Sequence, residues 1–295
     1  DSRTPVIWLV AASLTNIVLD IVFILTFRMD VFGAALATVL SQALAGVGCL
    51  IRLVRGYPVL KMDREDWYPD RGRLGELCLM GLPMGLQYSI TAIGSVMLQT
   101  AVNGLGTVYV TVVTAASKVS LFLCCPFDAM GCTMATYGGQ NVGAAKWERL
   151  HQGVRACVTL GAVYSGIALV ILLLFSDPLT MLFLDEGSVE LLPLARQNLL
   201  TTASCYFLLA LINIFRFLIQ GMGFSPLATL AGVLEMAARA GLACLVPVFG
   251  FTAACFASPV AWLMADAFLV PAYFYCYRRL AQPNAGRRKL AAAAR

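Results

Sequence analysis

The sequence has little charge. Only 13% of its 295 residues are Asp, Glu, Lys or Arg, against roughly 25% in soluble globular domains. Hydrophobic residues make up 60% of the chain, and its mean hydropathy is +0.80. This balance excludes an ordinary soluble domain and indicates a membrane protein. The net charge of +5 is too small and too scattered to suggest a nucleic-acid partner.

Metal-ligating residues and catalytic motifs are also scarce. The chain has one histidine, His151, and its ten cysteines form no CxxC pair, so a zinc site lacks ligands. No HExxH or GxSxG motif is present, and we therefore expect neither an enzyme nor a metal centre. The cysteines lie mostly in apolar runs, where we predict reduced thiols that pack as small hydrophobic groups.

Long apolar runs are what the sequence does contain. A transmembrane helix needs about 20 mostly apolar residues, and proline, glycine and charge divide this chain into eight such segments. We predict an all-α, polytopic membrane protein with spans at 5–27, 31–54, 74–103, 107–136, 153–175, 191–220, 226–248 and 252–277.

The basic residues predict the orientation of these spans. If the segment before the first span is cytoplasmic, 16 of the 21 Lys and Arg residues lie on the cytoplasmic side. Cytoplasmic loops carry an excess of Lys and Arg. We therefore expect a multi-pass protein of a bacterial cytoplasmic (inner) membrane, with both termini in the cytoplasm.

One long polar connection, "RGYPVLKMDREDWYPDRGR" at 55–73, separates two spans from six. A weak repeat crosses it, because Pro5 and Pro226 each open a span and "GAALATVL" (33–40) resembles "AACFASPV" (253–260). We predict that 1–54 holds the last two helices of an N-terminal lobe. The inter-lobe linker would be 55–73, a six-helix lobe would occupy 74–280, and a basic cytoplasmic tail would follow at 281–295.

Ionisable side chains within the spans are the most informative residues. Each costs at least about 2.5–3.5 kcal/mol at the centre of a membrane helix, so it usually serves a function or has a partner. The candidates that we single out within the predicted spans are Asp20, Lys118, Asp128, Arg216, Glu235, Arg239 and Asp266.

Asn16 and Asp20 lie four residues apart, on one face of the first helix. Asp20 is seven residues before the end of its span, and Thr38 is seven residues after the start of the next. Both therefore lie about 10 Å below the outer surface. A carboxylate, an amide and a hydroxyl suit Na⁺, or a carboxylate that takes up a proton. The alternative is an aspartate that hydrogen bonds hold neutral, for helix packing alone.

The C-terminal spans offer further candidates for a cavity or for coupling. Glu235 and Arg239 are four residues apart and can form an ion pair that is either structural or functional. Arg216 is expected to reach the cytoplasmic interface with its long side chain. Lys118 lies mid-span and needs an acidic partner.

Polar residues in the third span, Gln87, Tyr88 and Gln99, could line a cavity. The acidic candidates for a partner of Lys118 are Asp128, Glu235 and Asp266, and the sequence does not rank them.

Several motifs resemble those of the multidrug and toxic compound extrusion (MATE) transporters. "NIVLD" and "FGAALATVLSQ" look like parts of that family's fifth and sixth helices, and "GLPMGLQYS" (81–89) like the start of its seventh. "GGQNVGA" (138–144) and "QGMGFSP" (220–226) look like the end of its eighth helix and its tenth-to-eleventh loop. The resemblance implies twelve helices in two lobes, of which this chain would lack the first four.

The resemblance also implies a coupling site. DinF-like and archaeal members have a cation or proton site of two aspartates, an asparagine and a threonine, and Asn16, Asp20 and Thr38 match three of these positions. The fourth would lie in the missing segment. The acidic residues that NorM-type members carry in the seventh and tenth helices have no counterpart within 77–102 or 191–220.

The implied function is a multidrug efflux antiporter that exchanges H⁺ or Na⁺ for cationic or amphipathic drugs or metabolites by alternating access. We expect a monomer in the lipid bilayer, with no cofactor except the coupling ion, which would bind at Asp20. The alternative is a lipid-linked oligosaccharide flippase of the same wider superfamily. A flippase would need several unpaired basic residues in its cavity, and the sequence offers only Lys118.

Overall fold

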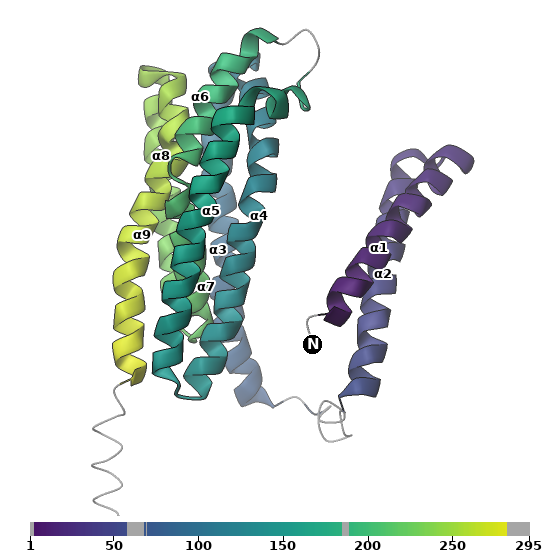
Figure 1. Cartoon of the computed structure of the whole chain (residues 1–295), viewed down its shortest axis with the longest axis vertical. Coiled ribbons are helices and arrows are strands. Elements are labelled where there is room, and N and C mark those ends of the chain that lie inside the picture. Colours follow the sequence, from purple (N-terminus) through teal and green to yellow (C-terminus); the bar gives the residue numbers. More distant parts are fainter. Residues whose placement is uncertain (1–2, 58–67, 69, 185–188, 282–295) are drawn as a thin grey trace, which may run out of the picture. The chain divides into compact units, whose positions relative to one another are not determined.

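A computed structural model describes residues 3–57, 68, 70–184 and 189–281, and every regular element in these ranges is helical (Figure 1). The first elements are α1 (Arg3–Ile21), its π-helical continuation η1 (Val22–Thr26), α2 (Asp30–Gly56) and α3 (Arg71–Asn103). They are followed by α4 (Thr107–Gly143), α5 (Trp147–Met181), η4 (Val189–Leu191), α6 (Leu192–Ala203), α7 (Tyr206–Gly221), α8 (Ser225–Phe249) and α9 (Phe251–Ala281).

The prediction of eight membrane spans is confirmed. Within the described ranges, seven helices are long and apolar enough to cross a bilayer, and two helices bent by 46° at residues 204–205 make an eighth candidate span when they are taken together. The helices are longer than predicted, because polar segments such as "TYGGQNVG" continue the helical backbone beyond the apolar stretch. α4 thus ends at Gly143 and not at 136.

The chain divides into two compact units, Asp1–Arg71 and Gly72–Arg295. In the first unit, α1 and α2 pack against each other through small residues. Ala12, Gly33 and Ala37 are buried there, as expected where two membrane helices approach closely. Most of the predicted linker (58–67 and 69) and nearly all of the predicted tail (282–295) lie outside the described residues.

The second unit is a bundle of the helices α3 to α9, in which α4 packs on α7 and α8 on α9. Its core contains large side chains that are fully buried, among them Phe127, Tyr206 and Tyr273. Leucines and phenylalanines on the outer faces, such as Leu121, Phe122 and Leu174, are more than 60% exposed. Side chains of this kind suit contact with lipid.

Candidate functional site

Asp20 and Asn16 are partly buried on α1, and each has one buried polar atom without a hydrogen-bond partner among the described residues. Asp20 Oδ1 and Asn16 Nδ2 are buried from solvent and make no hydrogen bond to any described residue. At least one oxygen of the carboxylate is therefore shielded within the helix pair, while the residue as a whole is only partly buried. A buried polar atom without a partner is unfavourable, so this pair of groups is suited to bind a proton, an ion or a water molecule.

The backbone changes its winding directly after Asp20. Residues Val22–Thr26 form a π-helical turn, in which the Phe27 N–H donates to the Val22 carbonyl at 3.1 Å. Such turns are rare and occur frequently at functional sites. Asp20 thus lies at the boundary between two helical geometries.

The third predicted ligand, Thr38, lies on an exposed part of α2, and its hydroxyl donates to the Ala34 carbonyl at 2.9 Å. The hydroxyl proton is therefore used within α2, while the oxygen lone pairs remain available for a cation. No hydrogen bond joins Thr38 to Asp20 or Asn16 within the described residues.

In the second unit, a buried carboxylate binds two arginines. Glu235 on α8 is 4% exposed, and it accepts hydrogen bonds from Arg239 at 2.7 Å and from Arg216 on α7 at 2.5 Å. The ion pair predicted from the spacing of Glu235 and Arg239 is present. The prediction for Arg216 was wrong, because this residue is only 7% exposed and pairs with Glu235 inside the bundle.

Asp266 on α9 completes the cluster. It is 5% exposed, lies within electrostatic range of Arg216 and Glu235, and has no hydrogen bond to either carboxylate oxygen from the described residues. Two arginines and two acids make the formal charge of this charge cluster (Arg216, Glu235, Arg239 and Asp266) zero. Charge balance between neighbours is what allows such groups to stay buried.

Lys118 does not belong to the charge cluster. It is exposed on α4, and its ammonium lies 5.7 Å from the ring centroid of Phe183. The predicted ion pair with an acidic residue is absent among the described residues, so that prediction was wrong. A cation over an aromatic ring is favourable, and a flexible lysine can reach such a site.

A cavity of about 580 Å³ lies beside the charge cluster. Gln87 and Tyr88 of α3 line it, as their polarity suggested, together with Asp128 of α4 and residues of α7 and α8. Gln87 is buried and accepts a hydrogen bond from Gln220 at 2.7 Å. Three charged cluster residues also line this cavity: Arg216, Glu235 and Arg239.

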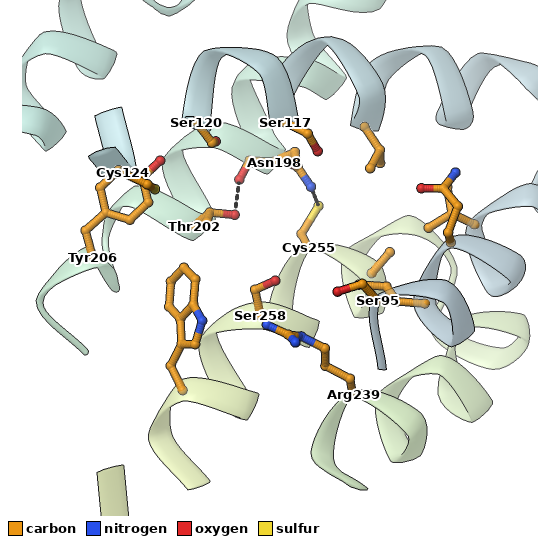
Figure 2. Close-up of a pocket in the computed structure, with 16 residues that line it drawn as sticks. Ser95, Ser117, Ser120, Cys124, Asn198, Thr202, Tyr206, Arg239, Cys255 and Ser258 are labelled. Atoms are coloured by element: carbon orange, nitrogen blue, oxygen red, sulfur yellow. Dashed lines mark hydrogen bonds between the residues drawn. The ribbon is translucent and has the colours of Figure 1, made fainter. Parts of the chain in front are cut away.

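A second, smaller cavity of about 270 Å³ lies among α3, α4, α6, α7, α8 and α9 (Figure 2). Ser95 and Arg239 line both cavities, and Gln99 lines this one. Its remaining polar residues are mainly hydroxyl groups from different helices. Sequence reasoning missed them, because single serines in apolar helices carry no signal of their own.

Comparison with known proteins relates this chain to one family of membrane proteins. A family model described as MatE matches residues 83–245. The chain is 25% identical over 215 residues to the probable multidrug resistance protein YoeA of Bacillus subtilis (strain 168), covering 70% of this chain and 46% of that protein. It is 29% identical over 187 residues to the probable multidrug resistance protein YpnP of the same organism, covering 63% and 41%. The chain thus spans less than half the length of these relatives.

Solved structures with the same fold include a MATE transporter in complex with MaL6. That structure superposes with a TM-score of 0.85 at 20% identity, over 94% of this chain and 63% of the other. The MATE transporter VcmN of Vibrio cholerae in its bent form gives a TM-score of 0.80 at 19% identity, over 95% and 64%. At this level of identity the match concerns the fold alone.

Proposed function

The chain belongs to the MatE family of membrane transporters, and from this premise we propose that it acts in a secondary active efflux antiporter. The antiporter exchanges H⁺ or Na⁺ for cationic or amphipathic compounds by alternating access. It works in a bacterial cytoplasmic membrane with both termini in the cytoplasm, as a monomer, and its only cofactor is the coupling ion.

The observation that carries this proposal is the polar pair on α1. Asp20 Oδ1 and Asn16 Nδ2 are buried without hydrogen-bond partners among the described residues. A charged carboxylate at that depth is costly, and a proton or a cation would remove the cost. A half-turn of the Asn16 amide would present its oxygen in place of its nitrogen, which adds a second ligand for Na⁺.

Coupling requires that the ion change the relative stability of two arrangements of the helices. Deprotonated Asp20 favours the arrangement in which its oxygens reach a donor or water. Protonated or cation-bound Asp20 favours the arrangement that releases the compound. The π-helical turn at Val22–Thr26 is the adjacent backbone segment that could change its winding between them.

The compounds are of the kind that the names of the Bacillus relatives suggest, since both are described as probable multidrug resistance proteins. The cavity of about 580 Å³ supports this assignment, because Asp128, Tyr88 and Phe217 line it. A carboxylate and two aromatic rings suit a cationic, partly apolar compound.

The flippase alternative has less support. It requires basic residues that are free to hold a phosphate, but Arg216 and Arg239 both donate to Glu235. Lys118 lies over Phe183 instead.

The test replaces the coupling carboxylate without changing its size. We expect Asp20→Asn to abolish efflux driven by a proton or sodium gradient in proteoliposomes, because the amide cannot gain and lose a charge. The measurement is transport of a fluorescent cationic dye against the imposed gradient.

The matched control is Asp30→Asn, which makes the same change at an exposed position of the same unit. Asp30 has a φ of 43°, a conformation that asparagine also tolerates, so the control should fold and transport like the parent. Gradient-driven efflux that survives Asp20→Asn would refute the proposed role.

A further inference from the structure

The smaller cavity of the second unit is rich in hydrogen-bond donors. Tyr206 is 0% exposed and lines the cavity, and its hydroxyl makes no well-formed hydrogen bond among the described residues, although it interacts with the neighbouring side chains of Ser120 and Cys124. The hydroxyls of Ser117 and Ser258 also line it. The Asn198 amide donates only to the Cys255 sulfur, at 3.5 Å, and sulfur is a weak acceptor. Buried donors whose neighbours are weak or poorly placed acceptors leave a place for a stronger acceptor.

The charge on the lining of this cavity is positive. Arg239 is the charged residue among its lining side chains, and no acidic side chain of the described chain lines it. One guanidinium nitrogen of Arg239 donates to Glu235 at 2.7 Å. A guanidinium has five N–H donors, so Arg239 has further donors that a ligand could use. Figure 2 shows the guanidinium pointing toward Ser258.

The bent membrane span adds a second positive feature. Two residues at the break in the span line the cavity. They are Thr202, in the last turn of α6, and Tyr206, the first residue of α7. The N-terminus of the 16-residue α7 has no side-chain cap. Helix N-termini carry unsatisfied N–H groups and a partial positive charge, which attract anions.

The rest of the lining is apolar and sets the size of the ligand. Trp262, Val102 and Val113 form part of the wall. A volume of about 270 Å³ holds ~9 water molecules at about 30 Å³ each, which corresponds to an organic molecule of roughly ten non-hydrogen atoms. The lining therefore suits a compound with an anionic head and an apolar body.

We propose that this cavity is a binding site for a small organic anion, whose carboxylate accepts hydrogen bonds from Arg239 and Tyr206 while its apolar body contacts Trp262. The site lies within the second unit and does not involve Asp20. It is a binding function distinct from the proposed ion coupling and from the export of cationic compounds.

The experiment uses two probes of similar size and opposite charge, benzoate and benzylammonium, with the purified protein in nanodiscs. Calorimetric titration is expected to show saturable binding of benzoate and none of benzylammonium. Arg239→Gln should weaken benzoate binding about tenfold or more, since a hydrogen bond to a charged group contributes roughly 1.5–3 kcal/mol. Tyr206→Phe, which removes one donor and leaves the ring, should weaken it about threefold to tenfold.

The matched control for the charge is Arg196→Gln, because Arg196 is 47% exposed and forms a long contact with Asp177. It should bind benzoate like the parent. Benzoate that does not bind, benzylammonium that binds as tightly, or Arg239→Gln and Tyr206→Phe proteins that bind benzoate like the parent would each overturn the proposal.

Tyr206→Phe decides the question alone if Arg239→Gln does not fold. The Asp20→Asn protein should bind benzoate normally, so failure of the proposed antiport and failure of this site are distinguishable.

Discussion

At the scale of single residues, Glu235 and Asp266 are two buried carboxylates in different situations. Glu235 accepts from two guanidinium groups, whereas Asp266 has no hydrogen-bond partner among the described residues. Both carry the same formal charge, and both are about 95% buried. Their contributions to stability should therefore differ through hydrogen bonding and not through burial.

We expect Glu235→Gln to destabilise the protein more than Asp266→Asn. Breaking a buried pair by removing one partner costs about 3–5 kcal/mol, because an uncompensated charge is left behind, and Glu235→Gln leaves two buried guanidinium groups. Asp266→Asn removes a carboxylate that has no direct donor. The measurement is thermal unfolding of both variants in the same detergent. Equal losses would mean that Asp266 and Arg216 are bonded in the folded protein.

The sequence predicted part of this charge cluster. The spacing of four between Glu235 and Arg239 places both on one helical face, and their ion pair is present. Arg216 is 19 residues from Glu235 on another helix, and no periodicity links them. The position of Arg216 near the end of its span suggested an exposed side chain, but α7 is among the most buried helices, so the partner lies inward.

At the scale of helices, hydropathy located all eight spans but not the bend in one of them. The stretch "TTASCYF" at 201–207 contains neither proline nor glycine, the usual causes of a sharp kink. The backbone nevertheless breaks by 46° there. The donor-rich cavity lies at this break, and discontinuous membrane helices occur where they line a cavity. No local proline or glycine accounts for the bend.

The contact between α4 and α7 can be tested with two glycines. A Cβ on Gly221 would meet the backbone of Ala135 on α4, whereas a Cβ on Gly166 of α5 would meet nothing. We expect Gly221→Ala to lower the midpoint of thermal unfolding, because backbone atoms must move apart. Gly166→Ala should leave it unchanged or raise it, since alanine favours a helix by up to about 1 kcal/mol. Similar effects of the two substitutions would contradict the close α4–α7 contact.

At the scale of the whole molecule, the family and the helical fold were predictable, because membrane helices and their motifs are visible in sequence. The arrangement of polar groups around Asp20 was not predictable from the sequence. Asn16 is a neighbour on the same helix, but Thr38 lies on another helix and uses its hydroxyl proton within α2. Hydropathy gives the depth of a side chain in the membrane and not its rotation about the helix axis, so shared depth alone did not predict contact.

The orientation in the membrane is a prediction for the entire chain. Lys146, Arg149 and Arg155 mark the connection before α5 as cytoplasmic, whereas the connection after α5 is acidic, with Asp185 and Glu186. Positive loops stay on the cytoplasmic side. Green fluorescent protein fused after Lys146 should therefore fluoresce in cells, and alkaline phosphatase fused there should be inactive. Fusions after Leu184 should give the opposite pair of results, since α5 crosses the membrane between the two points. Because each point carries both reporters, low expression cannot mimic the expected result, and reversed signals at both points would place the termini outside.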